Sequence, residues 1–169
     1  MRILRPRGFA LSVHHIDYEA LWGRGIRALI FDLDNTLCLW RAGPPDVGTR
    51  GLLEGLIGRG FRVAVVSNGR LSRRPEVVSF FEGIGVPVIW RARKPFPFGF
   101  RRVLGLFGVR AGQAAMIGDQ VFTDVLGGNL AGLYTILVEP LEPTRESPFT
   151  RFNRLLERFI RRRRPAQGS

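Results

Sequence analysis

The chain has 169 residues and a mass of 19.0 kDa, which allows one domain with a substantial core and is too short for two domains of ordinary size. Hydrophobic residues make up 45% of the sequence and charged residues 24%, which excludes a disordered or fibrous chain. The net charge of +12 is concentrated in residues 1–27 and 149–169. Such ends favour an anionic partner, although charge alone does not separate nucleic acid, anionic lipid and acidic protein, and termini that are simply solvated are an equal alternative.

The sequence predicts neither a membrane span nor a disulfide. No apolar run approaches the ~18 residues that a span requires, and the apolar stretch 9–13 is too short for a signal sequence. Cys38 is the single cysteine, which excludes an internal disulfide and a cysteine-based metal cage. We expect a cytoplasmic protein, with peripheral contact to the inner face of the membrane as an open alternative.

Short apolar runs alternate with longer, helix-compatible segments along the chain. We predict strands at Ala28–Leu33, Phe61–Ser67, Val86–Trp90, Ala114–Gly118 and Leu133–Val138. Helices are predicted near 48–59, 74–83, 97–107 and 123–131. Because the strands are continuously apolar, they are typical of a parallel sheet that is buried on both faces. The sequence therefore predicts a doubly wound α/β fold, in which ligands bind beyond the carboxyl ends of the strands.

Polar side chains follow four of these five strands. The first strand is followed by the carboxylates of Asp32 and Asp34, and the second ends at the hydroxyl of Ser67. The third is followed by the ammonium of Lys94, and the fourth by the carboxylates of Asp119 and Asp124. Four carboxylates in one cleft are costly unless a cation neutralises them, and an all-oxygen ligand set suits Mg²⁺. Each residue alone has an ordinary explanation as a helix cap or a surface charge, but the ordered combination predicts a site for a metal and a phosphate.

Two details strengthen this interpretation. Asp32 and Asp34 are two residues apart and lie on the same side of the chain if the extended conformation continues past the strand. Lys94 is the only lysine among 26 basic residues, which indicates a special role.

The sequence lacks the motifs that other classes of phosphate-binding protein require. A cysteine phosphatase requires Cys-x5-Arg, but position 44 is proline. A P-loop requires Gly-Lys-Ser/Thr, but Lys94 follows arginine. In a receiver domain the accessory acidic pair precedes the phosphoacceptor, whereas here the second acid follows it. The adjacent His14 and His15 lack a chelating spacing, so we predict a structural or surface role for them.

The motifs Asp32-x-Asp34, Ser67, Lys94 and Gly118-Asp119-x4-Asp124 resemble those of the haloacid dehalogenase (HAD) superfamily. More narrowly, segments 31–37, 93–95, 117–120 and 127–129 resemble the YqeG-like phosphatases of subclass IIIA, which include mitochondrial and plastid phosphatidylglycerophosphate phosphatases. The resemblance extends from about Leu4 to Arg154 and implies a HAD-like Rossmannoid core.

The resemblance also implies the role of each residue. Asp32 would attack phosphorus to form an aspartyl-phosphate, and Asp34 would act as the general acid and then as the general base. Mg²⁺ would be held by the side chains of Asp32 and Asp119 and the backbone carbonyl of Asp34, with Asp124 in support. Ser67 and the backbone amides around Leu33 and Asn68 would hold the phosphoryl oxygens, and Lys94 would neutralise charge in the transition state.

The motif spacing predicts that no large cap domain covers the site. Asp34 and Ser67 are separated by 32 residues, and Ser67 and Lys94 by 26. One helical crossover between two strands needs all the residues of each interval, which leaves none for a cap domain. The site should therefore be open and admit a phosphate on a large group or at a surface. We expect segment 38–46 to form its lip.

We expect a single domain over residues 1–169, with a basic arm at 1–27 and a basic amphipathic helix at about 148–164. That helix suits an anionic membrane surface, although its apolar face could equally pack on the domain. The leading hypothesis is therefore a Mg²⁺-dependent phosphatase of phosphatidylglycerophosphate, which makes phosphatidylglycerol. A phosphatase of soluble phosphomonoesters, such as nucleotides or sugar phosphates, and an RNA-binding or ribonucleoprotein-binding module with secondary phosphatase activity are the alternatives.

Overall fold

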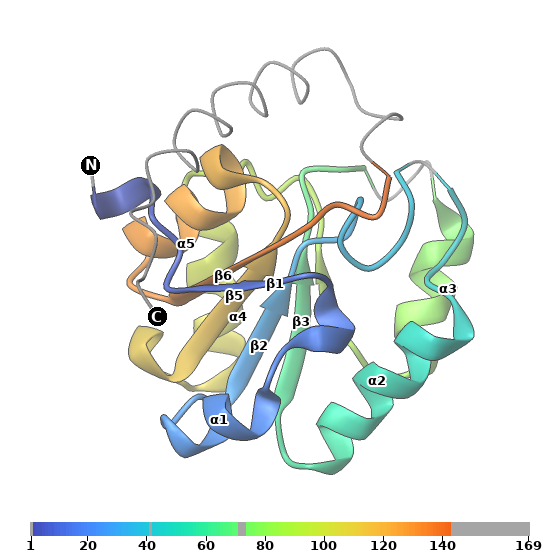
Figure 1. The fold of residues 1–169 in the computed structure, drawn as a ribbon. Coiled ribbons are helices and arrows are strands. Elements are labelled where there is room, and N and C mark those ends of the chain that lie inside the picture. The colour runs from blue at the N-terminus through green and yellow to red at the C-terminus, as the bar shows by residue number, and fades with distance from the viewer. Residues whose placement is uncertain (1, 41, 71–73, 143–169) are drawn as a thin grey trace.

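A computed structural model describes residues 2–40, 42–70 and 74–142. They form one parallel sheet of six strands in the order β1-β6-β5-β2-β3-β4 (Figure 1). The strands are β1 (Gly8–Ala10), β2 (Ala28–Phe31), β3 (Arg62–Val66), β4 (Val88–Ile89), β5 (Ala114–Gly118) and β6 (Tyr134–Val138). The order reverses at β2, between β3 and β5, and this topology confirms the predicted doubly wound α/β fold.

Helices cover both faces of the sheet (Figure 1). They are α1 (Tyr18–Gly23), α2 (Val47–Gly58), α3 (Pro75–Gly83), α4 (Phe98–Phe107) and α5 (Leu126–Leu130). The side chains of α1, α2 and α3 join one buried cluster, whereas those of α4 join a second cluster on the opposite face. A π-helical turn, Val121–Val125, leads into α5.

The apolar strands are buried on both faces because alternate residues enter different cores. Leu29 and Phe31 of β2 belong to the cluster with α2, while Ala28 and Ile30 belong to the cluster with α4. Helix α4 approaches the sheet closely at Gly99, where an added Cβ would lie 3.0 Å from Val66 Cγ1 and 2.9 Å from Ala92 Cβ. The core thus fixes the strands whose ends carry the polar residues.

The structure contains two elements before residue 28 that the sequence did not predict. Strand β1 pairs in parallel with β6 at the edge of the sheet, although it has only three residues and none is fully buried. Helix α1 begins after Asp17, whose carboxylate accepts a hydrogen bond from Ala20 N at 2.9 Å. Both elements are too short to produce a clear hydrophobic period.

Short crossovers connect the strands, as the motif spacing predicts. Helix α2 occupies the interval between β2 and β3, and α3 occupies the interval between β3 and β4, with no large cap domain in either. No helix in the described ranges is long and apolar enough to cross a membrane. The helix predicted at about 148–164 lies outside the described residues.

Candidate active site

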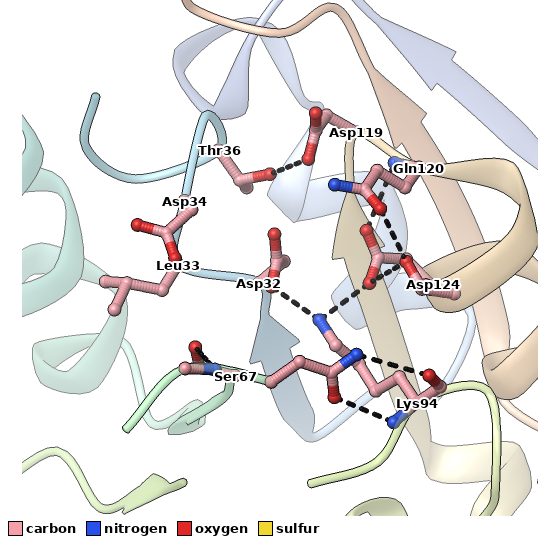
Figure 2. Close-up of polar contacts among 12 residues, drawn as sticks. Asp32, Leu33, Asp34, Thr36, Ser67, Lys94, Asp119, Gln120 and Asp124 are labelled. Atoms are coloured by element: carbon pink, nitrogen blue, oxygen red, sulfur yellow. Dashed lines mark hydrogen bonds and ion pairs between the residues drawn. The ribbon is translucent and has the colours of Figure 1, made fainter. Parts of the chain in front are cut away.

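Four strand ends meet at the carboxyl edge of the sheet and bring the predicted polar residues together (Figure 2). Asp32 follows β2, Ser67 follows β3, Lys94 follows the short β4, and Asp119 follows β5. Because all the strands are parallel, these residues emerge on the same side of the sheet. Asp124 joins them from the π-helical turn after β5.

The Lys94 ammonium lies between two carboxylates. It forms an ion pair with Asp32, and its Nζ donates to Asp124 Oδ1 at 2.7 Å (Figure 2). All three side chains are buried. Burial lowers the pKa of Lys94, but the two carboxylates outweigh this effect and raise it above its usual value. The ammonium is therefore charged at neutral pH.

The carboxylate of Asp32 is poorly compensated in this arrangement. Burial raises its pKa to about 7, and the negative charges of Asp124 and Asp34 add to that shift, while Lys94 opposes it. A cation in the site would oppose this shift by stabilising the charged carboxylate.

Three buried carboxylates form a set that fits a divalent cation. One oxygen each of Asp32, Asp119 and Asp124 lies within 4.8 Å of the others. Lys94 compensates one of their three negative charges, which leaves the charge that a divalent cation would neutralise. The donors are all oxygens, as hard cations prefer. Thr36 Oγ1 donates to Asp119 Oδ1 at 3.2 Å and orients this carboxylate.

The carboxylate of Asp34 does not belong to this set. Strand β2 ends at Phe31 and the chain then turns, with Leu37 N donating to Leu33 O at 3.0 Å, so the extended conformation does not continue. In Figure 2, Asp34 lies on one side of Asp32 and Asp124 on the other. The Asp34 carboxylate thus lies outside the cluster, and the metal contact through its backbone carbonyl stays a prediction.

Arg74 holds the Asp34 carboxylate, a contact that the sequence did not predict. The guanidinium forms an ion pair with Asp34 and donates to Ala42 O at 2.9 Å and to Cys38 Sγ at 3.5 Å. Burial lowers the pKa of Arg74, but Asp34 outweighs it and raises the pKa. Arg74 therefore ties the acidic residue to the predicted lip, 38–46. Asp34 and Arg74 are 40 residues apart in a chain rich in arginine, so no local pattern marked the pair.

The loop after β3 is organised around Ser67 and Asn68. Ser67 Oγ accepts a hydrogen bond from Gly69 N at 3.0 Å, which leaves its own hydroxyl proton available to donate. The Asn68 side chain donates to Lys94 O at 3.2 Å and accepts from Lys94 N at 2.8 Å. These two bonds fix the loop that carries Lys94. The predicted contact of the Asn68 backbone amide with a phosphate stays a prediction.

Cys38 lies beside the site but has no nucleophilic character. Its side chain is buried, and burial raises the pKa of the thiol to about 12. This finding agrees with the absence of a cysteine-phosphatase motif.

Gly118 sets the position of Asp124. A Cβ at residue 118 would lie 2.2 Å from Asp124 Oδ2 and 2.4 Å from Asp124 Cγ, so Gly118→Ala must displace this carboxylate. We expect the substitution to weaken divalent-metal affinity by about 10- to 100-fold, measured by calorimetric titration. Gly112→Ala is the matched control, because no atom lies within 4 Å of the added Cβ. Equal metal affinity in the two variants would contradict the placement of the metal.

Comparisons with known proteins agree with the geometry. A family model described as HAD-hydrolase-like matches residues 91–140. The chain is 39% identical over 157 residues to the Bacillus subtilis protein named Probable phosphatase YqeG, covering 92% of this chain and 88% of that protein. The chain therefore belongs to the HAD superfamily and, within it, to the YqeG-like phosphatases of subclass IIIA. It is a phosphatase, a phosphoric monoester hydrolase, as the motifs predicted.

More distant relatives carry different substrate names. A chloroplastic phosphatidylglycerophosphate phosphatase 1 of Chlamydomonas reinhardtii is 33% identical over 85% of this chain, and a glyceraldehyde 3-phosphate phosphatase of Pyrococcus abyssi is 30% identical over 78%. The chain spans 55% and 56% of these two proteins. The cobalt-bound deoxy-D-mannose-octulosonate 8-phosphate phosphatase of Haemophilus influenzae shares the fold, with a TM-score of 0.54 and 20% identity over 67% of this chain and 66% of that one.

Proposed function

We propose that the protein is a Mg²⁺-dependent phosphatase that hydrolyses phosphatidylglycerophosphate to phosphatidylglycerol through an aspartyl-phosphate on Asp32. The observation that carries the reaction type is the buried cluster of Asp32, Asp119, Asp124 and Lys94 at the switch point of the sheet. A phosphoryl-transfer site needs a nucleophile, a positive charge beside it and ligands for a cation. A carboxylate, an ammonium and two further carboxylates supply these groups here.

In the first step an oxygen of Asp32 forms a bond to phosphorus, and the bond from phosphorus to the leaving alcohol oxygen breaks. Asp34, which must enter this step as the protonated carboxylic acid, donates its proton to that oxygen. In the second step the Asp34 carboxylate accepts a proton from water, whose oxygen attacks phosphorus and breaks the bond to Asp32. The side chains of Asp32 and Asp34 then return to their starting states, and inorganic phosphate leaves.

The remaining groups bind and neutralise the phosphate. Ser67 and the backbone amides of Leu33 and Asn68 hold the phosphoryl oxygens, while Lys94 faces the charge that develops in the transition state. The carboxylates of Asp32, Asp119 and Asp124 and the backbone carbonyl of Asp34 would hold Mg²⁺, which supplies the positive charge that lets an anionic nucleophile approach an anionic phosphate.

The lipid substrate is supported by the open site and by the name of the Chlamydomonas relative. In the described part of the chain, α2 and α3 fill the intervals in which other HAD enzymes carry caps, which favours a phosphate attached to a large, membrane-held group. A soluble phosphomonoester is the second candidate, and the glyceraldehyde 3-phosphate phosphatase relative favours it.

Phosphate release by the purified protein tests the proposal. The substrates are phosphatidylglycerophosphate in mixed micelles and a panel of soluble phosphomonoesters, each with Mg²⁺ and with EDTA. We expect Mg²⁺-dependent release with the highest kcat/KM on the lipid. A higher kcat/KM on a soluble ester would overturn the lipid substrate and leave the reaction type standing, whereas salt-sensitive RNA binding without phosphate release would support the binding-module alternative.

Arg74→Ala tests the role of the ion pair with Asp34. We expect kcat to fall by about 10- to 100-fold with little change in KM, because Arg74 orients the proton donor without touching the phosphate. Arg74→Lys should recover part of the loss, since it restores the charge but not the second hydrogen bond, to Ala42 O. Arg50→Ala is the control, because the Arg50–Glu54 pair is exposed. A rise in KM at constant kcat would contradict this role.

A further inference from the structure

One tight turn buries Lys94 and exposes its neighbours on the outside of the molecule. Phe96 N donates to Arg93 O at 2.9 Å, which closes a turn around Lys94 and Pro95. The ammonium of Lys94 faces the carboxylates, whereas the side chain of Phe96 is 60% exposed. The four residues 93–96 therefore run from the buried active-site lysine to the molecular surface.

Phe98, at the start of α4, adds a second exposed ring. It is 65% exposed, and its ring centroid lies 6.5 Å from that of Phe96. Among the described residues, Phe9 is the other phenylalanine classed as exposed, and the remaining large exposed apolar side chains are aliphatic. A pair of exposed aromatic rings beside a catalytic site marks an interaction surface more specifically than scattered aliphatic residues do.

The turn is held rigidly against the phosphate-binding loop. Arg91 N donates to Gly69 O and Ala92 N donates to Ser67 O, each at 3.0 Å. Arg91 and Arg93 have φ angles of 49° and 56°, a left-handed conformation that is uncommon outside glycine. Such strain persists where the surrounding contacts enforce it and is frequent at functional sites. The backbone that carries the exposed rings is thus fixed to the loop of Ser67.

The chain segment that carries the rings has charges of one sign. No aspartate or glutamate occurs between Glu82 and Asp119. Five exposed arginines lie within this stretch, and the four nearest in sequence to the rings are Arg91, Arg93, Arg101 and Arg102. Aromatic side chains among arginines match an anionic bilayer interface, where rings enter the headgroup boundary and guanidinium groups contact lipid phosphates.

Apolar side chains also border the site from other strand ends. Leu39 follows β2 and is 37% exposed, and Leu141 follows β6 and is 45% exposed. Leu141 N donates to Asn35 O at 2.9 Å, which places Leu141 beside the loop of the acidic pair. The carboxyl edge of the sheet therefore carries exposed apolar groups on more than one of its loops.

We infer that the aromatic turn, residues 91–98, docks on an anionic lipid bilayer by inserting Phe96 and Phe98 into the interface while its arginines contact lipid phosphates. This inference rests on the proposed lipid substrate and names the surface that brings the site to it. Because Lys94 belongs to the same turn, docking places the active site at the level of the headgroups.

Sedimentation with phospholipid vesicles tests the inference without catalysis. Vesicles of phosphatidylcholine with phosphatidylglycerol, and of phosphatidylcholine alone, are mixed with the wild type and with two double variants, Phe96→Ser/Phe98→Ser and Arg91→Gln/Arg93→Gln. We expect binding to the anionic vesicles only, reduced at least tenfold in both variants. Leu106→Ser is the matched control, because Leu106 is also 60% exposed and lies at the other end of α4. Its binding should equal that of the wild type.

Phe96→Trp gives a second measurement that does not depend on loss of binding. Brominated lipids should quench its fluorescence more than that of the wild type, which has three tryptophans. Absence of vesicle binding, equal binding by the Phe96→Ser/Phe98→Ser variant, or no added quenching would overturn the inference. Vesicle binding without hydrolysis of phosphatidylglycerophosphate would instead overturn the proposed function, so the two failures are distinguishable.

Discussion

Asp32→Asn is expected to lower the rate of phosphate release by at least ~10³-fold, because an amide removes both the attacking oxygen and one charge of the metal cluster. The side chain keeps its size, so the buried space beside the Lys94 ammonium stays filled. The measurement is single-turnover phosphate release at saturating Mg²⁺, which separates chemistry from product release.

Asp17→Asn is the matched control for this substitution. Asp17 caps α1 far from the cluster, and asparagine caps helices about as well as aspartate. We expect its activity to equal that of the wild type. Activity of Asp32→Asn within tenfold of the control would exclude Asp32 as the nucleophile.

Lys94→Met is expected to lower the free energy of unfolding by about 3–5 kcal/mol in EDTA, because it leaves the carboxylates of Asp32 and Asp124 buried without their cation. The loss should be smaller with Mg²⁺, which restores positive charge to the site. Urea denaturation in EDTA and in Mg²⁺ measures both values. Phosphate release should also fall, since the Lys94 ammonium then no longer neutralises charge in the transition state.

The pH dependence of this variant has a defined sign. Burial already raises the pKa of Asp32 to about 7 in the presence of Lys94, and removing the lysine removes the group that opposes the shift. When the pKa of a carboxyl is raised in the folded state, the free energy of unfolding of the protein falls as the pH rises through that pKa. The penalty of Lys94→Met should therefore be larger at pH 8 than at pH 5. Arg62→Met, an exposed change on β3, should cost less than ~0.5 kcal/mol at either pH.

The sequence was informative wherever a strand end and a motif coincide. The apolar runs located β2, β3, β5 and β6, because strands that are buried on both faces exclude polar residues. Parallel strands then place their following residues at one edge, so Asp32, Ser67, Lys94 and Asp119 were expected to meet there. The single lysine of an arginine-rich chain lies at the centre of the resulting ion-pair cluster.

The missed features depend on contacts that no local pattern encodes. Strand β1 has three partly exposed residues and is ordered by pairing with β6, which lies more than 100 residues later. The pairing of Arg74 with Asp34 also depends on the turn after β2, which directs the Asp34 carboxylate away from the metal cluster. Two carboxylates in a DxD motif therefore have separate environments, which allows one to serve as nucleophile and the other as acid.

Acid quenching during turnover tests the central claim most directly. The wild type is mixed with a ³²P-labelled phosphomonoester and Mg²⁺, quenched in acid within milliseconds, and digested to locate the label. We expect a hydroxylamine-labile phosphate on the peptide that contains Asp32, absent with EDTA and in Asp32→Asn. Turnover at a normal rate without any labelled protein, or with the label on another residue, would contradict the proposed role of Asp32.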